Sequence, residues 1–409
     1  MHEVIVIGGG AAGIFAALQA EKGSALVLEK TAVLLSKVKI SGGGRCNVTH
    51  ACFDPKLLVK NYPRGEKELL GPFHRFQPND TIEWFESRGV KLKTEPDGRM
   101  FPVTDSSSTI IECLLAEAKR QDVEIRMRQH VMRVVKTSEG FDVHLKEGDV
   151  LTCKKLILAS GSSAEGYSYA QALGHTIESP VPSLFTFNVP TSPLKELSGI
   201  AVESATVKIE GSPFVYTGPV LITHFGFSGP AVLKLSAWGA RLLHEKNYRV
   251  DILINWIPQL SFEELQREIG RLKESSPQKS LLALNPFHFP KNLWKALVMD
   301  KLLAHLSKKE IQEVCQRLQA DRYHVDGKTT HKEEFVTCGG VQLKEVDFKT
   351  MQSKICPGLY FAGEVLNIDG ITGGFNFQNA WTTGYIAGQK STSSDRGDKN
   401  EGGGSALAL

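Results

Sequence analysis

A run of six small residues, Gly8–Gly13, has the residue types and spacing that bind phosphate groups. The run reads GGGAAG and follows Val4–Ile7, a β-branched segment typical of a strand buried on both faces. The next residues, IFAALQAEKG, have apolar positions at helical spacing, and a second apolar segment, ALVLEK, ends at Glu29. This strand–turn–helix–strand order, with an acid at its end, matches the G-x-G-x-x-G fingerprint of dinucleotide binding.

Each position of this fingerprint has a physical role. Gly8 permits the tight turn, Gly10 lets the backbone approach a pyrophosphate, and Gly13 allows the helix to pack closely on the strand. The N–H groups at the helix start would hold the phosphate charge, and Glu29 would accept hydrogen bonds from ribose hydroxyls. The sequence therefore predicts a dinucleotide site, without separating FAD from NAD.

A second half-site near the other end of the chain favours FAD. A short apolar strand, Leu359–Ala362, runs into Gly363-Glu364, and GGFN at 373–376 opens the final helix. The acid could bind a ribitol hydroxyl, while the helix N-terminus could stabilise negative charge on the pyrimidine edge of a reduced flavin. An NAD enzyme does not need this arrangement, so we expect FAD, with NAD(P)H possible as a reductant.

The stretch KISGGGRCNVTH, residues 39–50, allows two interpretations. Cys46 could be a redox centre, with Cys52 as its partner, as in disulfide reductases. Alternatively the glycines form a backbone cradle against a cofactor, and the thiol is incidental. Two features favour the cradle: Cys46 and Cys52 are one residue further apart than in that class, and no second Gly-rich fingerprint follows a strand.

The composition excludes several classes of protein. The 409 residues carry a formal net charge of +3, with 41% hydrophobic and 23% charged residues and no dense Lys/Arg block. We therefore expect a small-molecule substrate and neither nucleic acid nor a membrane as partner. The seven scattered cysteines lack a CxxC motif, which argues against a disulfide scaffold or a zinc or other metal site and favours the cytoplasm.

The pattern of elements indicates α/β architecture with an insertion. A helix at 106–121 and a buried strand at Leu156–Ala159 are expected to continue the first domain, and residues 54–104 are expected to form loops with short helices. Short strands with alternating apolar residues are expected after 187, and strand patterns return at 324. Between them, a group of helices starts at 261, with capping-box spacing at Ser261 and Glu264. The last residues, from 392, are low-complexity, and we expect them to be disordered.

Taken together, these segments resemble the bacterial NAD(P)/FAD-dependent oxidoreductase family called aminoacetone-oxidase-like, within the flavoproteins that have two dinucleotide-binding domains. The matching segments are GGGAAG with Glu29, SGGGRCN (41–47), FPVTD (101–105), THFGFSGP (223–230), CGGV (338–341), TMQSK (350–354) and FAGEVLNIDGITGGFNFQNAW (361–381). One departure is Asn367, where the family commonly has Asp, with Asp369 two positions on.

The resemblance implies a fold with specific boundaries. A Rossmann-type FAD-binding domain (1–187 and 345–391) would be split by an inserted β-barrel-like domain (188–260 and 324–344). The insert would itself carry a helical subdomain (261–323), followed by a tail (392–409).

The resemblance also implies roles for single residues. The loop after Lys37 would wrap the FAD, Arg45 would neutralise its charge, Val131 would hold the adenine through backbone atoms, and Phe377 would lie at the flavin. His224 is the candidate acid/base, although a histidine at a turn before Ser228-Gly229-Pro230, a pattern typical of a helix start, more often has a structural role. The predicted cofactor-binding residues are Gly8, Gly10, Ala11, Ala12, Gly13, Glu29, Lys30, Lys37, Gly43, Gly44, Arg45, Cys46, Asn47, Val131, Ala159, Ser160, Gly161, Gly363, Glu364, Gly374, Phe375, Asn376 and Phe377.

Three functions remain open on the sequence. The first is an FAD-dependent oxidoreductase that moves hydride between flavin N5 and a small organic substrate, by amine oxidation or by NAD(P)H-linked enone reduction. The second is a disulfide-reductase-like flavoprotein that uses Cys46 and Cys52. The third is a non-catalytic FAD-binding interaction protein.

Overall fold

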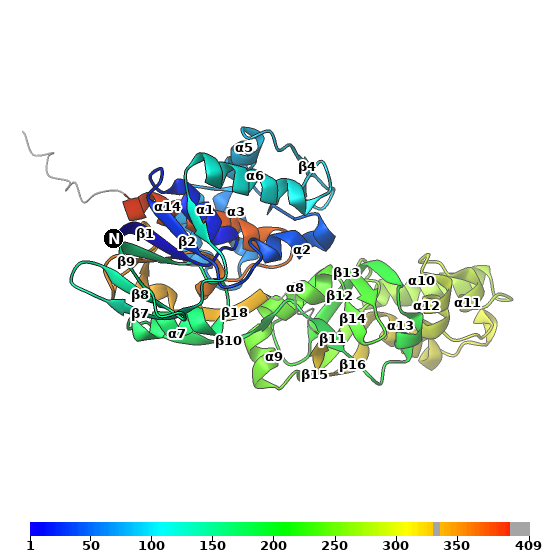
Figure 1. Cartoon of the computed structure of the whole chain (residues 1–409). Coiled ribbons are helices and arrows are strands. Elements are labelled where there is room, and N and C mark those ends of the chain that lie inside the picture. The colour runs from blue at the N-terminus through cyan, green and yellow to red at the C-terminus, as the bar shows by residue number, and fades with distance from the viewer. Residues whose placement is uncertain (330–335, 393–409) are drawn as a thin grey trace, which may run out of the picture.

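The central sheet of the first domain is the scaffold of the cofactor site. A computed structural model describes residues 1–329 and 336–392 (Figure 1). The sheet has the order β19-β20-β21-β9-β1-β2-β6, and its middle strands are parallel. Its strands are β1 (His2–Ile7), β2 (Ala25–Leu28), β6 (Glu124–Arg126), β9 (Val150–Leu158), β19 (Val346–Asp347), β20 (Gln352–Ser353) and β21 (Leu359–Phe361).

Segments from the two ends of the chain meet in this domain. Helix α1 (Ala11–Gln19) packs against α14 (Phe375–Thr392), as their neighbouring blue and orange-red ribbons in Figure 1 show. The approach is close because α14 has glycines at the contact: a Cβ at Gly388 would lie 2.1 Å from the Ala16 carbonyl oxygen. The N-terminal fingerprint and the C-terminal half-site are therefore side by side in space.

Further elements complete this domain. The hairpin of β7 (Val131–Lys136) and β8 (Phe141–Leu145) continues antiparallel into β9. Helices α6 (Ser107–Arg120) and α7 (Ala164–Ala172) follow β5 and β9 respectively, and the short turns η4 (Leu343–Glu345) and η5 (Gly363–Val365) flank β21 and its neighbours.

The segment between residues 36 and 102 contains more regular structure than its sequence predicts. It contains the expected short helices, and it also forms a three-stranded sheet of order β3-β5-β4. Its elements are α2 (Ser36–Gly44), β3 (Thr49–His50), α3 (Pro55–Leu58), η1 (Val59–Asn61), α4 (Glu66–Phe73), α5 (Pro78–Glu86), β4 (Leu92–Thr94) and β5 (Arg99–Pro102). The strands are only two to four residues long, too short for a local periodicity to be recognised, and β3 pairs with β5 across about 50 positions.

The inserted domain is built on a seven-stranded antiparallel sheet. The chain leaves the first domain through β10 (Ile177–Ser183), which pairs with the returning β18 (Val336–Val341). The inserted sheet has the order β16-β15-β12-β13-β14-β11-β17 and curls so that β11 also contacts β16 at its other end. Its strands are β11 (Thr186–Asn188), β12 (Ala201–Ile209), β13 (Val215–Ile222), β14 (Gly226–Ser228), β15 (Arg249–Asn255), β16 (Asp321–Asp326) and β17 (Lys328–Thr329).

Helices cover the insert and extend it. The turn η2 (Pro193–Leu197) and helices α8 (Pro230–Trp238) and α9 (Ala240–Glu245) accompany the sheet. Beyond β15 come α10 (Phe262–Ser275), α11 (Leu281–Leu284), α12 (Lys291–Leu297), η3 (Leu303–His305) and α13 (Lys308–Gln319). The capping box at Ser261 and Glu264 is confirmed. In Figure 1 this helical part forms the end of the insert away from the Rossmann-type domain.

The predicted fold class is confirmed, and the element positions refine the proposed division. The boundary at 187/188 falls within β11 and the boundary at 323/324 falls within β16, and both strands belong to the inserted sheet. The chain therefore crosses between domains near Leu184, a few residues earlier than the sequence suggested. The proposed tail lies, from residue 393 on, outside the described residues. No helix within 1–329 and 336–392 is long and apolar enough to cross a membrane.

Each domain has its own hydrophobic core. Phe15 and Trp381 are among the fully buried side chains of the first, and Trp256 and Trp294 of the second. Ligand sites commonly lie between such independently packed domains.

Candidate functional site

A cavity of about 870 Å³ runs from the glycine turn of β1 to the inserted domain. It is large enough for a dinucleotide-sized ligand with further space beside it. Most of the predicted cofactor residues line it: Gly8, Gly10, Ala11, Ala12, Glu29, Lys30, Lys37, Gly43, Asn47, Val131, Ala159, Ser160, Gly161, Gly363, Glu364, Gly374, Asn376 and Phe377. Their contact with a cofactor remains a prediction.

The glycine turn leaves an open cradle above its centre. A Cβ at Gly8, whose φ is +114°, would lie 2.4 Å from the Ala159 carbonyl oxygen, and one at Gly13 would lie 1.9 Å from the Gly8 oxygen. These two glycines are required by the protein's own packing. At Gly10, by contrast, a Cβ would meet no atom within 4 Å. That empty space at the start of α1 is where a phosphate would approach the backbone N–H groups.

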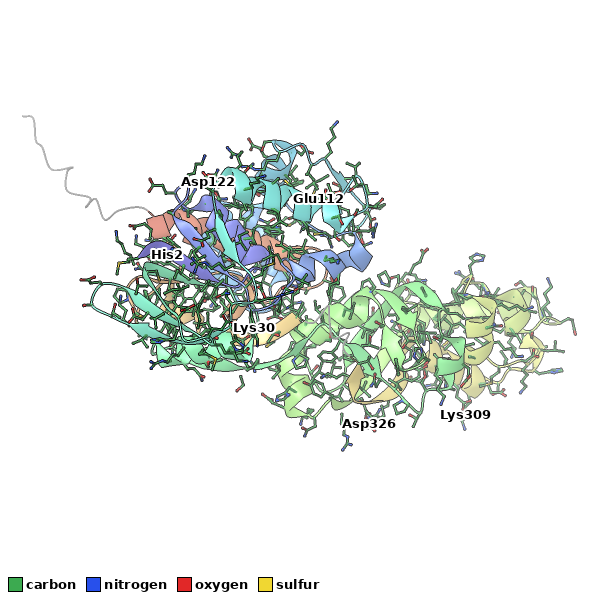
Figure 2. The ribbon with its side chains drawn as sticks, in the orientation of Figure 1. His2, Lys30, Glu112, Asp122, Lys309 and Asp326 are labelled. Atoms are coloured by element: carbon green, nitrogen blue, oxygen red, sulfur yellow. The ribbon has the colours of Figure 1, made fainter. Side chains whose placement is uncertain are left out.

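Glu29 is held at the end of β2 by backbone donors. Its Oε2 accepts the Gly9 N–H at 2.8 Å and its Oε1 accepts the Thr31 N–H at 2.7 Å. Each carboxylate oxygen keeps lone pairs for a ligand hydroxyl. The neighbouring Lys30 is paired with Glu165, which lowers the pKa of that carboxyl. In the view of Figure 2, Lys30 lies on the side of the first domain that faces the insert, whereas Lys309 lies on the distant helical part.

The other end of the cavity is organised around Glu364 and the start of α14. Glu364 accepts the Thr337 N–H at 2.9 Å and contacts Lys37 Nζ at 2.5 Å. Asn376 closes the preceding loop, because its side chain accepts from the Gly370 N–H at 2.8 Å and donates to the Gly370 carbonyl at 2.9 Å. With its oxygen turned toward α14, the Asn47 amide accepts the Gly374 N–H at 3.0 Å.

Two buried polar atoms on the cavity wall have no hydrogen-bond partner among the described residues. They are Ser160 Oγ and Asn379 Oδ1. Because an unsatisfied buried group costs about 1–3 kcal/mol, such atoms indicate a ligand that supplies the missing partner. Together with the open cradle at Gly10 and the acid at Glu29, they fit FAD. The sequence analysis did not identify Asn379, and the one indication available was a polar residue within the buried part of α14.

Arg45 does not line the cavity. Its guanidinium donates to Glu95 Oε1 at 2.6 Å, lies 3.5 Å from Asp105, and stacks 3.9 Å from the centre of the Phe101 ring. The position of Arg45 therefore does not support its predicted role of neutralising cofactor charge. Arg99 of β5 lines the cavity instead.

The cysteine of the same loop faces the core. Cys46 is fully buried, and burial raises the pKa of its thiol to about 12. Cys52 is partly exposed, and burial raises the pKa of its thiol as well. Both are free thiols, and neither lines the cavity. A nucleophilic redox cysteine needs a lowered pKa, so this environment does not support the disulfide-reductase alternative.

Four more predicted residues lie outside the cavity lining, and one of them, Gly13, serves the close packing of α1 on the Gly8 carbonyl. Gly44 and Phe375 flank residues that do line it, and the Phe375 ring packs on Tyr62 and His50. His224 is exposed at the turn between β13 and β14, where its ring lies 4.0 Å from that of Phe225. The structure does not bring His224 to the cofactor cavity. Within the described residues no cluster of three His, Cys, Asp or Glu side chains could hold a metal ion.

The inserted domain provides a wall that the sequence did not indicate. The lining residues of the insert and of its two connections are uncharged and are mostly apolar or hydroxylated: Leu184, Phe185, Thr186, Ser228, Leu233, Thr329 and Val336. Leu184 has a φ of +58°, a strained conformation for a non-glycine residue, at the point where the chain enters the insert. The cavity is therefore bounded by a polar, charged cradle on one side and a neutral wall on the other.

Comparison with known proteins places this geometry in context. The sequence profile described as "HI0933-like protein Rossmann domain" matches residues 2–390. The chain is 31% identical over 406 residues to the Ribosomal RNA dihydrouridine synthase of Escherichia coli (strain K12), covering 95% of this chain and 97% of that protein. It is 27% identical over 409 residues to the 3-dehydro-bile acid delta(4,6)-reductase of Clostridium scindens, covering 95% and 98%.

Among solved structures, the chain resembles the 3-ketosteroid-delta4-(5alpha)-dehydrogenase of Rhodococcus jostii RHA1 in complex with 4-androstene-3,17-dione. The TM-score is 0.51 at 15% identity, covering 96% of this chain and 97% of the other. At that identity the likeness concerns the fold alone.

Proposed function

Because this chain belongs to the HI0933-like family of FAD-dependent oxidoreductases, we propose that it reduces a carbon–carbon double bond conjugated with a carbonyl group. The observation that supports this most is the continuous cavity, which joins a cradle that fits FAD to a neutral wall that fits a flat organic molecule. Two relatives also support it by their names, since dihydrouridine is uridine with its 5,6 double bond saturated and a delta(4,6)-reductase saturates ring double bonds.

When bound, FAD supplies two-electron chemistry, because its reduced ring can give a hydride to carbon. The residues of the chain have separate tasks. Gly10 and the N–H groups that follow receive the pyrophosphate, and Glu29 and Glu364 receive ligand hydroxyls. The N-terminus of α14 provides a positive field that favours negative charge on the flavin. Leu184, Phe185 and Leu233 exclude water from the space where the substrate lies.

The overall reaction needs a reductant and a proton. The substrate would gain a hydride at the carbon β to the carbonyl and a proton from water at the α carbon, and a reduced nicotinamide would supply the two electrons and become oxidised. The sequence contains one G-x-G-x-x-G unit after a strand, and this unit is assigned to FAD. We therefore propose that the nicotinamide and the substrate occupy the same space beside the cofactor in turn.

A second candidate differs in the substrate. The 31% identity to a protein named for ribosomal RNA favours a uridine within RNA over a free small molecule, and it weakens the sequence-based expectation that nucleic acid is not a partner. The uracil ring is also flat, neutral and carbonyl-bearing, so the same wall suits it.

Anaerobic half-reactions test the proposal. The purified holoprotein is reduced by NADH or NADPH, and the bleached flavin is then mixed with 4-androstene-3,17-dione, uridine, or ribosomal RNA. Return of the oxidised flavin spectrum, with one saturated product formed per flavin, supports the proposal and identifies the substrate class.

Other results would contradict it. Bleaching by a primary amine, with reoxidation by oxygen alone, would instead favour the amine-oxidation alternative. A flavin that no nicotinamide or amine reduces would favour the non-catalytic alternative.

A further inference from the structure

Three hydroxyl-bearing side chains form a row across three strands of the inserted sheet. In the register between β11 and β14, Phe187 pairs with Phe227, and continuing this register places Thr186 opposite Ser228. On the other side of β11, Thr186 pairs with Thr329 of β17. Directly opposite residues on neighbouring strands share one face of a sheet. All three hydroxyl residues line the cofactor cavity.

The opposite face of the same strands faces the domain core. Phe187 and Phe227 alternate with the hydroxyl residues and are fully buried in the core of the insert. A slip by one residue would exchange the two faces and would bring a residue with a side chain to the position of Gly226. That position has no room for one, because a Cβ there would be 2.3 Å from the Phe187 carbonyl oxygen. The row is therefore fixed toward the cavity by packing behind it.

Each of the three side chains has one hydroxyl hydrogen, and the hydrogen of Ser228 remains available for a ligand. Thr186 donates to Ser228 Oγ at 2.9 Å, and Thr329 donates to Asn188 Oδ1 at 2.8 Å. Among the described residues, the Ser228 hydroxyl has Thr186 as its hydrogen-bond partner and accepts from it. The Ser228 hydroxyl does not cap helix α8 either, because the N-cap residue is Gly229 and no side chain caps the helix.

We propose that Ser228 donates this hydrogen to the carbonyl oxygen of the substrate, and that Thr186 is the positioning residue that orients and polarises it. This inference rests on the proposed reduction of a conjugated double bond. Hydride addition to the β carbon moves negative charge onto the carbonyl oxygen, so a donor aimed at that oxygen stabilises the transition state. The bond from Thr186 strengthens the donor by polarising its oxygen.

The surroundings of the row define the class of substrate. Leu184, Phe185, Leu233 and Val336 contribute apolar contact area, and the described lining of this wall contains no charged side chain. A flat, neutral ring that carries a conjugated carbonyl fits such a wall. A charged carboxylate or phosphate placed against it would lose its hydration without a compensating partner.

The test compares Ser228→Ala, Thr186→Val and Thr186→Ser holoproteins. A matched control is Thr206→Val, because Thr206 and Thr217 form a similar cross-strand hydroxyl pair at 2.6 Å in the same sheet but outside the cavity lining. The first readout is the infrared carbonyl stretch of 2-cyclohexen-1-one labelled with ¹³C at its carbonyl, bound to oxidised holoprotein. The second is the rate at which the same enone reoxidises the reduced protein.

We expect the bound carbonyl stretch to shift to lower frequency in the wild type and in Thr206→Val, and to lose this shift in Ser228→Ala. The reoxidation rate should fall about 100-fold in Ser228→Ala, as for the loss of one oxyanion donor. The loss should be smaller in Thr186→Val, with recovery in Thr186→Ser. The FAD content should not change.

The outcomes separate this inference from the function on which it rests. Suppose that the wild-type protein reduces the enone and that Ser228→Ala keeps both the wild-type carbonyl shift and the wild-type reoxidation rate. This result would overturn the role of Ser228 and leave the proposed function standing. A Ser228-dependent shift in a protein that never transfers electrons to an enone would support the binding site and overturn the proposed reaction. Failure of the enone to bind wild-type protein would overturn the substrate class.

Discussion

Replacement of Arg64 by Met removes one partner of a buried ion pair in the first domain, at its contact with the insert. The guanidinium of Arg64 makes two hydrogen bonds to Asp369, and it donates to the Ala237 carbonyl of α8 at 2.8 Å. Asp369 is fully buried and also accepts from Ser183 at 2.7 Å, at the end of the strand that leads into the insert. Arg64 therefore connects the first domain, the insert and the loop that precedes α14.

The expected loss follows from the burial of Asp369. Removing one partner of a buried pair leaves an uncompensated charge and destabilises proteins by about 3–5 kcal/mol. Burial already raises the pKa of the Asp369 carboxyl, although Arg64 opposes the rise. Without Arg64 the pKa rises further, so the folded state binds a proton more tightly than the unfolded chain. The stability of Arg64→Met relative to the wild type should then increase as pH falls from 7 toward the ordinary pKa of Asp, about 3.9.

Urea unfolding of the wild type, Arg64→Met, Asp369→Asn and the double variant measures this effect. We expect the double variant to be more stable than Arg64→Met, because the buried charge has gone. The gap between wild type and Arg64→Met should narrow at pH 5. Equal unfolding midpoints for these two proteins at pH 7, or a gap that widens on acidification, would refute the reasoning.

Three further predictions concern the glycine turn, Ser160 and Cys46. Gly13→Ala places a Cβ 1.9 Å from the Gly8 carbonyl oxygen and should prevent correct folding, as circular dichroism will show. Gly10→Ala meets no protein atom, so it should keep the stability of the wild-type apoprotein but lose FAD, as flavin absorbance will show. Ser160→Ala removes an unsatisfied buried hydroxyl, so the apoprotein should gain up to about 1 kcal/mol of unfolding free energy while FAD binding weakens about tenfold. A loss of apoprotein stability without a change in FAD affinity would contradict this assignment. Cys46 should resist alkylation at pH 8 in the folded protein because its thiol pKa is about 12, and Cys46→Ala should keep full turnover; a gain of two free thiols on NADPH addition would reverse that conclusion.

The parts of the site that the sequence predicts are those encoded by local patterns. The glycine turn, the acid at the end of β2 and the glycine pair before α14 each have their partners within a few residues or in a standard order of elements. Glu29 and Glu364 line the cavity as expected because the ends of parallel strands point to one edge of the sheet.

The parts that the sequence did not predict depend on pairing between distant segments. Arg45 adjoins the glycine cradle in sequence, yet Glu95 and Asp105, about 50 and 60 positions on, hold its charge away from the cavity. Likewise the row of Thr186, Ser228 and Thr329 exists only through the register of three strands. Each of these short strands has two or three residues, too few for an alternating pattern to be recognised.

The most direct measurement is anaerobic mixing of the NAD(P)H-reduced holoprotein with a conjugated enone. We predict that the oxidised flavin spectrum returns and that one saturated ketone forms per flavin. A flavin that stays bleached in the presence of enones, uridine and ribosomal RNA alike, yet reoxidises readily in oxygen, would contradict the proposed reduction.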